Sequence, residues 1–160
     1  ASQLEGGGYR FAKDELDFSD LVMDSISDFQ RRFPDRTIHS QVQPEVELQG
    51  DPLLLQMLVN NLVENALKYS PADKSITITL EGMNKEILLQ VVDEGIGVPD
   101  NEKKKIFNRF YRIGNEATRK TPGTGLGLYL CSKIARDHNA DISVTNHNPQ
   151  GSNFAVKFHT

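Results

Sequence analysis

Three short segments rich in glycine and aromatic residues organise this chain: DEGIGVP at 93–99, IFNRFYR at 106–112 and PGTGLGL at 122–128. An apolar run precedes Asp93, which predicts a strand that is buried on both faces and ends in a carboxylate. Gly95 and Gly97 follow directly, and glycines let a ligand approach the backbone closely. The first segment therefore predicts a pocket in which one fixed acceptor receives a polar ligand.

Asp93 has two interpretations. A buried carboxylate needs hydrogen-bond donors. The exocyclic amine of adenine is such a donor, whereas guanine presents an acceptor at that position. The alternative is an aspartate that only begins a turn, because Asp-x-Gly is common in turns. On this residue alone the turn is the simpler interpretation.

A helix earlier in the chain carries the next candidate ligands. Asp51, followed by proline, predicts a helix start, and the apolar pattern continues to about Tyr69. Asn61 and Asn65 are four residues apart and therefore share one face. An amide oxygen suits Mg²⁺, which usually shares substrate phosphates, and Lys68 can reach a phosphate. The alternative, in which the asparagines bond neighbouring backbone and the lysine is solvated, is equally consistent with this helix alone.

The third segment opens another predicted helix, from Gly125 to about His138. Free N–H groups and the helix dipole favour an anion at such a start, and Thr124 adds a hydroxyl. The glycines do not follow directly on a strand, which excludes the dinucleotide-binding fingerprint, and no P-loop or protein-kinase motif set is present. The alternative is that the three glycines serve only close packing, and this is the weaker interpretation because a threonine accompanies them.

The second segment combines aromatic and basic residues. Phe107 and Phe110, three apart on a short helix predicted at 101–108, are core candidates. Arg109 and Arg112 are ordinarily surface residues, but they could also move onto a phosphate about a hinge formed by the aromatics. The polar stretch 114–122 that follows predicts a mobile loop.

The remaining pattern mixes helices and strands. Ser19 is the expected N-cap of a helix that continues to about Phe33, and Asn139 is expected to end a later helix in a left-handed conformation. Short strands are predicted at 9–18, 37–43, 46–49, 76–80, 87–93, 142–144 and 154–158. The order predicts an α+β fold in which a sheet is covered on one face by three helices.

Composition narrows the function classes. The 160 residues suffice for one domain with its own core, and the net charge of −4 argues against nucleic acid as the main partner. The single Cys131 excludes an internal disulfide and fits a reducing compartment. No run approaches 18 apolar residues, so we expect a cytoplasmic domain, with any membrane anchor of a longer parent outside this chain.

In this combination and order, the motifs resemble those of the catalytic ATP-binding domain of bacterial two-component sensor histidine kinases. That family belongs with DNA gyrase B, Hsp90 and MutL among ATPases. NLVENALKYS at 61–70 looks like the N box, DEGIG at 93–97 like G1, IFNRFYR like the F box and GTGLGL at 123–128 like G2. The resemblance implies a two-layer sandwich with a mixed sheet of about five strands, three helices, and a mobile ATP lid from about 108 to 124.

The resemblance also implies roles for individual residues. Asn65 would hold Mg²⁺, Lys68 would contact phosphate and Asp93 would recognise adenine. The full implied nucleotide site consists of Asn61, Asn65, Lys68, Tyr69, Asp93, Gly95, Ile96, Gly97, Phe110, Gly123, Thr124, Gly125, Leu126 and Gly127. The implied catalytic residues are Asn61, Glu64, Arg109 and Arg112.

Two departures from the family pattern concern loops. Gly151 is a single glycine where the family often has Gly-x-Gly, and Asn139-Ala140 replaces a common glycine pair. A further feature separates the branches of the family. ATPases of the wider family carry a glutamate four residues before the metal-binding asparagine, and this chain has Asn61 there. That difference favours a kinase over an ATPase.

None of the histidines lies in a phosphoacceptor box; they are His39, His138, His147 and His159. We therefore expect residues 1–8 to end a preceding dimerisation helix and linker, and residues 9–160 to form the catalytic domain. The expected partners are those dimerisation helices and a response-regulator receiver domain, with a monomeric fragment and a homodimeric parent. Two alternatives remain: an ATP-driven switch of the gyrase or chaperone kind, and a non-catalytic ATP-binding relay module.

Overall fold

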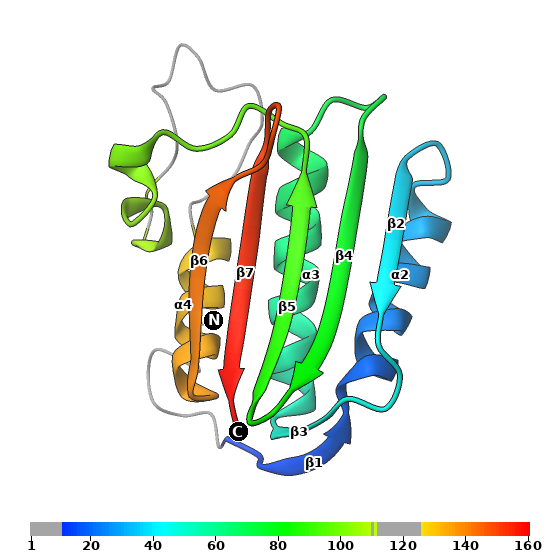
Figure 1. Cartoon of the computed structure of the whole chain (residues 1–160), viewed down its shortest axis with the longest axis vertical. Coiled ribbons are helices and arrows are strands. Elements are labelled where there is room, and N and C mark those ends of the chain that lie inside the picture. Colours follow the sequence, from blue (N-terminus) through cyan, green and yellow to red (C-terminus); the bar gives the residue numbers. More distant parts are fainter. Residues whose placement is uncertain (1–10, 110, 112–125) are drawn as a thin grey trace.

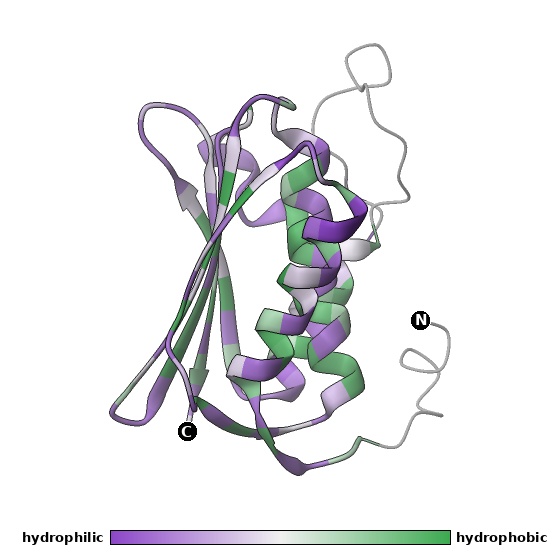
Figure 2. Cartoon of the chain, turned by 90° about the vertical axis from the view of Figure 1, so that its right-hand side faces the viewer, coloured by the Kyte–Doolittle hydropathy of each residue, from purple (hydrophilic) through white to green (hydrophobic). Residues whose placement is uncertain are grey.

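The structure is a computed structural model of the 160-residue chain, and it describes residues 11–109, 111 and 126–160. A sheet and a layer of helices lie side by side, with the helices on one face only (Figures 1 and 2). The apolar side chains between the two layers form the core. This arrangement confirms the predicted two-layer α+β fold.

The main sheet has five strands in the order β2 (Thr37–Val42), β4 (Ser75–Met83), β5 (Glu86–Asp93), β7 (Ser152–His159) and β6 (Ala140–Asn146). β2 and β4 are parallel, and the other neighbours are antiparallel, so the sheet is mixed as expected. β1 (Asp14–Asp17) and β3 (Glu47–Gly50) form a separate antiparallel pair. The sequence placed these strands correctly within a few residues but could not assign two of them to a second sheet.

The predicted burial of β5 on both faces is wrong. Its side chains alternate between buried and half-buried, with Leu89 and Val91 fully buried while Leu88 and Val92 are only half-buried. The helices lie over one face of the sheet, so only the β5 side chains that point toward the helices are fully buried (Figure 2).

Three α-helices occur in the described part of the chain: α2 (Phe18–Arg32), α3 (Pro52–Tyr69) and α4 (Gly127–Asp137). The N-cap of α2 is Asp17, whose Oδ1 accepts from the Asp20 backbone N–H at 3.0 Å, and not Ser19 as predicted. The Ser19 hydroxyl instead donates to the Gln43 carbonyl and accepts from the Val46 N–H. The Ser19 hydroxyl is thus used in contacts with residues far away in the sequence, which the local pattern does not encode.

The start of α3 confirms the sequence prediction. Asp51 Oδ1 accepts from the backbone N–H groups of Leu53 and Leu54 at 3.0 and 3.2 Å, and Pro52 occupies the first helical position. Its buried face is nearly continuous, comprising Leu54, Leu55, Leu58, Val59, Leu62, Val63, Ala66 and Leu67. α3 is therefore the element that fixes the site residues relative to the sheet.

The segment at 101–108 does not form the short helix that was predicted. It contains two 3₁₀ turns, η1 (Asp100–Glu102) and η2 (Lys105–Phe107), neither of which has a side-chain cap. Ile106 is buried, and the Phe107 ring packs edge-on against Phe154 with centroids 6.2 Å apart. Single turns anchored by side chains replace a helix here because the run is too short to support one.

Other local predictions are confirmed. Asn139 has a φ of 55°, the left-handed conformation expected after α4. β6 and β7 are joined through the predicted turn near Pro149. The predictions for residues 1–8 and for the loop at 114–122 lie outside the described residues. Within the part described, no helix has the length and apolar character needed to cross a membrane.

Candidate functional site

Asp93 lies at the end of β5 and is only 2% exposed. Its Oδ1 accepts from the backbone N–H of Gly95 at 2.9 Å and from that of Ser152 at 3.3 Å. Burial raises the pKa of this carboxyl, and the two backbone hydrogen bonds act in the opposite direction. No described group donates to Oδ2, so the carboxylate keeps one oxygen for an external donor.

Two glycines allow the backbone to pack closely around Asp93. A Cβ on Gly95 would lie 2.3 Å from the Tyr69 carbonyl oxygen, so the loop after β5 lies directly against the end of α3. Gly151 has a φ of +130°, and a Cβ there would lie 2.0 Å from the Asp93 carbonyl oxygen. Only glycine fits at either position. The single Gly151 therefore meets the local requirement where the family often has two glycines.

Glu94 fixes the same loop to the sheet, a role that the sequence did not reveal. Its carboxylate accepts from the Ser75 backbone N–H and hydroxyl, both at 3.0 Å, and its own N–H donates to the Ser70 hydroxyl at 3.3 Å. The two hydrogen bonds from Ser75 lower the pKa of Glu94. The neighbouring Ile96 is 67% exposed, and Gly97 adopts a φ of +79°. The loop after β5 is therefore held by hydrogen bonds at Glu94 and exposed at Ile96.

α3 and α4 meet where the N box and G2 motifs lie. A Cβ on Gly127, the first residue of α4, would be 3.8 Å from the Asn61 Oδ1 atom. No described side chain caps the N-terminus of α4. Deeper in the pair, the Cys131 thiol lies 3.8 Å from the Leu58 carbonyl, and burial raises its pKa strongly. The two predicted phosphate-site elements are thus adjacent.

The residues predicted on α3 lie along one accessible side of it. Asn61 and Asn65 are half-buried, one helical turn apart, and no hydrogen bond joins either amide to another described residue. Lys68 and Glu64 are exposed, and Tyr69 is half-buried. The residues described hold no cluster of three His, Cys, Asp or Glu side chains that could bind a metal. The Asn65 amide oxygen is an oxygen ligand of the kind that Mg²⁺ prefers.

The F box segment is attached to α4 and to η1. Arg109 Nη2 donates to the Tyr129 hydroxyl at 3.0 Å, and its guanidinium carbon lies 4.9 Å from the centre of that ring. The Tyr111 hydroxyl donates to Glu102, which raises the pKa of the tyrosine. Tyr129 was not singled out from the sequence. The remaining predicted site residues lie outside the described part of the chain; they are Phe110, Arg112, Gly123, Thr124 and Gly125.

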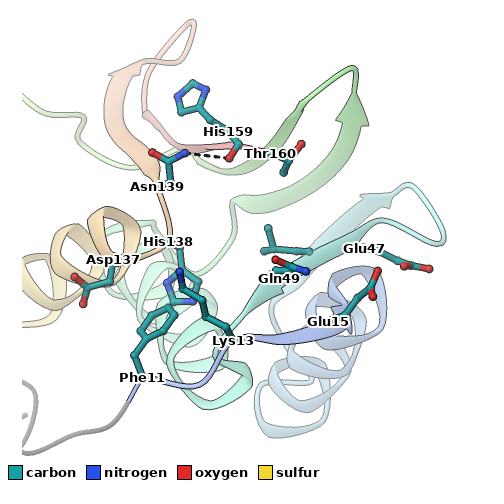
Figure 3. Close-up of a pocket in the computed structure, with 11 residues that line it drawn as sticks. Phe11, Lys13, Glu15, Glu47, Gln49, Asp137, His138, Asn139, His159 and Thr160 are labelled. Carbon is teal, nitrogen blue, oxygen red and sulfur yellow. Dashed lines mark hydrogen bonds between the residues drawn. The ribbon is translucent and has the colours of Figure 1, made fainter.

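A cavity of about 350 Å³ lies at the opposite end of β7 from Asp93 (Figure 3). It is lined by Phe11, Lys13, Glu15, Glu47, Leu48, Gln49, Asp137, His138, Asn139, His159 and Thr160. None of these residues was predicted in the nucleotide site. Buried His138, one of the lining residues, accepts from the Asp51 N–H at 3.0 Å through Nε2, so its Nδ1 donates to the Ile134 carbonyl at 2.8 Å. This histidine joins the end of α4 to the start of α3.

A two-layer fold with the N box helix α3 beside the G2 helix α4 and a buried aspartate at the end of β5 is the arrangement of an ATP-binding domain. The description "histidine kinase-, DNA gyrase B-, and HSP90-like ATPase" matches residues 50–160, and the chain belongs to this family. The resemblance drawn from the four motifs is thereby confirmed. Among curated relatives, sensor histidine kinase WalK of Bacillus subtilis (strain 168) is 36% identical over 153 residues, which are 88% of this chain and 24% of WalK.

Solved structures agree with that assignment. The mycobacterial sensor histidine kinase MprB superimposes with a TM-score of 0.81 at 25% identity, covering 92% of this chain and 97% of that one. The catalytic domain of histidine kinase ThkA gives 0.79 at 26% identity, covering 94% and 96%. The chain spans 24% of the length of WalK. The part of a sensor histidine kinase to which it corresponds is the ATP-binding catalytic domain.

Proposed function

We propose that this chain binds ATP with Mg²⁺ and positions the γ-phosphoryl group for transfer to a histidine on a separate dimerisation domain. The observation that carries the proposal is that the two carboxylate oxygens of Asp93 have different surroundings. One oxygen is held by the Gly95 and Ser152 backbone, and the other is left for a ligand donor. The exocyclic amine of adenine is such a donor, whereas the guanine oxygen at that position would face the carboxylate unfavourably.

The triphosphate would lie toward the start of α4. The N-terminus of this helix, which no described side chain caps, adjoins Asn61, and the first-turn N–H groups with the helix dipole favour an anion there. Lys68 is exposed near the end of α3 and would contact a phosphate, while Tyr69, held against Gly95, would contact the nucleoside. Mg²⁺ bound through Asn65 would neutralise charge on the phosphates.

The identity of residue 61 favours transfer to an imidazole. An asparagine cannot deprotonate a water molecule, and water needs a base to attack phosphorus. A neutral imidazole attacks through its unprotonated nitrogen and needs no base. The N–P bond forms as the bond from the γ-phosphorus to its bridging oxygen breaks, ADP leaves, and the proton on the other ring nitrogen passes to water. Glu64 is one residue before Asn65 on the exposed side of α3 and would orient the acceptor.

The proposed partners follow from this reaction. The acceptor histidine would lie on the helices of a separate dimerisation domain. The phosphoryl group would then pass to the receiver domain of a response regulator. The domain would act in the cytoplasm as part of a homodimeric kinase.

Calorimetric titration tests the binding step. A non-hydrolysable ATP analogue is titrated with and without Mg²⁺, beside the matching GTP analogue. We expect saturable binding that prefers adenine and is strengthened by Mg²⁺, with the Mg²⁺ effect lost in Asn65→Ala. Equal affinity for the two analogues in a folded sample would contradict the assignment of Asp93.

The transfer step needs a second assay. Labelled ATP is mixed with this chain and a supplied dimerisation domain that contains the acceptor histidine. We expect acid-labile, alkali-stable label on that domain, and loss of the label with Asn65→Ala. Binding without any transfer would support the non-catalytic relay instead.

A further inference from the structure

Tyr129 binds Arg109, a predicted catalytic residue, and has no role of its own in the proposed function. It lies in the first turn of α4, and it holds Arg109 by two contacts at once. The hydroxyl accepts from Nη2 at 3.0 Å, and the ring lies under the guanidinium at 4.9 Å. A hydrogen bond at the rim and a cation over the face of one ring together fix both the position and the tilt of the guanidinium plane.

The segment that carries Arg109 is held at the same time by its neighbours. Ile106 is buried in the core, Phe107 packs on Phe154, and Tyr111 donates to Glu102. The backbone on both sides of Arg109 is therefore attached to the domain. The Arg109 side chain is long and exposed, and the two contacts with Tyr129 restrict the orientation of its guanidinium.

The helix geometry places this pair relative to the proposed phosphate site. Gly127 faces Asn61, and Tyr129 is two residues later, which is about 200° around the helix. The Arg109–Tyr129 pair therefore flanks the first turn of α4 on the side away from Asn61. A guanidinium beside the positive N-terminal end of a helix is unfavourable by itself, and the contacts with Tyr129 hold Arg109 at this position. An anion bound there would be attracted both by the helix dipole and by the Arg109 charge.

We infer that Tyr129 is a positioning residue for phosphoryl transfer, which acts by fixing the guanidinium of Arg109 beside the N-terminal turn of α4. This inference rests on the proposed function, because it needs a triphosphate at that turn. The Arg109 guanidinium is a planar fork of N–H donors, and Tyr129 accepts from its Nη2. Prior orientation of the fork favours the charge distribution of the transition state more than ground-state binding.

The experiment compares Tyr129→Phe, Tyr129→Ala, Arg109→Ala and the double variant Tyr129→Ala/Arg109→Ala in the transfer assay. We expect Tyr129→Ala and Arg109→Ala each to lower kcat about tenfold with KM for ATP within about twofold. The double variant should be no slower than Arg109→Ala, because the tyrosine acts only through the arginine. Tyr129→Phe retains the ring and should lose only about threefold. Arg136→Ala, an exposed arginine on the same helix, is the matched control and should match the wild type.

A second measurement does not depend on activity. The Nε–Hε resonance of Arg109 in ¹H–¹⁵N spectra should carry a ring-current shift that disappears in Tyr129→Ala and largely remains in Tyr129→Phe. Additive losses of kcat in the double variant, or a wild-type rate in Tyr129→Ala, would overturn the inference while leaving the proposed function in place. Absence of transfer by the wild-type chain would remove both, and that result is distinguishable because it appears before any variant is made.

Discussion

At the end of β5, Asp93 accepts two backbone N–H groups through a single oxygen. The substitution Asp93→Asn retains an oxygen for those bonds but replaces the ligand-facing oxygen with an NH₂ donor. We expect the thermal midpoint to change little, and affinity for the ATP analogue to fall about 10- to 100-fold, as for loss of a hydrogen bond to a charged group. Calorimetry on both proteins measures this. Asp100→Asn, an exposed aspartate on η1, is the control; equal losses in both variants would point to a general charge effect.

Close packing between Gly95 and Tyr69 leads to a prediction about stability. A Cβ on Gly95 would lie 2.3 Å from the Tyr69 carbonyl oxygen, and neither partner is the flexible end of a side chain. We expect Gly95→Ala to lower the free energy of unfolding by about 1–3 kcal/mol, measured by urea denaturation. Gly82→Ala is the matched control, because a Cβ there meets its nearest side-chain atoms at 3.7 Å, an ordinary contact. A wild-type midpoint for Gly95→Ala would show that the loop can move away from α3.

At the scale of elements, the N-terminus of α3 depends on Asp51. Its carboxylate accepts from two N–H groups of the first turn and, through Oδ2, from the Ala12 N–H at 3.0 Å. We expect Asp51→Ala to lower the free energy of unfolding by about 1–2 kcal/mol or more, and Asp51→Asn to retain most of it. Urea denaturation with Asp24→Ala, an exposed residue inside α2, as the reference distinguishes the lost cap from lost charge. Equal midpoints for Asp51→Ala and Asp24→Ala would mean that the cap contributes nothing.

The elements also show what the sequence could and could not predict. α3 was predicted at both ends because Asp51, Pro52 and Ser70 encode its boundaries locally. The start of α2 was missed because Asp17 and Ser19 are both good N-caps, and contacts with the loop after β2 decide between them.

The residues of the candidate site also fall into those that the sequence predicts and those that it does not. Asp93 and Asn61 lie in local motifs and were predicted from them. Ser152 and Tyr129 were not, because their roles arise from contacts with residues 59 and 20 positions away in the chain. Pairing between distant segments has no signature in a single sequence, which is why both partners were missed.

At the scale of the whole molecule, His138 couples stability to pH. It connects α4 to the start of α3 in its neutral form, and burial lowers its pKa despite the nearby Asp51 and Asp137, with Lys13 acting in the same direction as burial. As the pH falls through about 6.5, the unfolded chain binds a proton at this histidine before the folded one does. The free energy of unfolding should therefore decrease between pH 7.5 and 5.5.

Urea denaturation at several pH values measures this dependence. We expect His138→Gln to be less stable than the wild type at pH 7.5 and to have a flatter pH profile. His39→Gln, which removes an exposed histidine on β2, should keep the wild-type slope. A wild-type slope in His138→Gln would assign the pH dependence to other groups.

The position of β7 has a consequence for the order in which the molecule can be assembled. β7 is the last strand in sequence, yet it lies inside the sheet between β5 and β6. During synthesis, β5 therefore gains its second neighbour only after residues 152–159 have left the ribosome, and the Ser152 N–H that bonds Asp93 arrives with that strand. Pairing over such a distance is slow compared with helix formation. A nascent chain would therefore form α3 early, whereas the proposed recognition of adenine by Asp93 would have to wait for β7 to pair with β5.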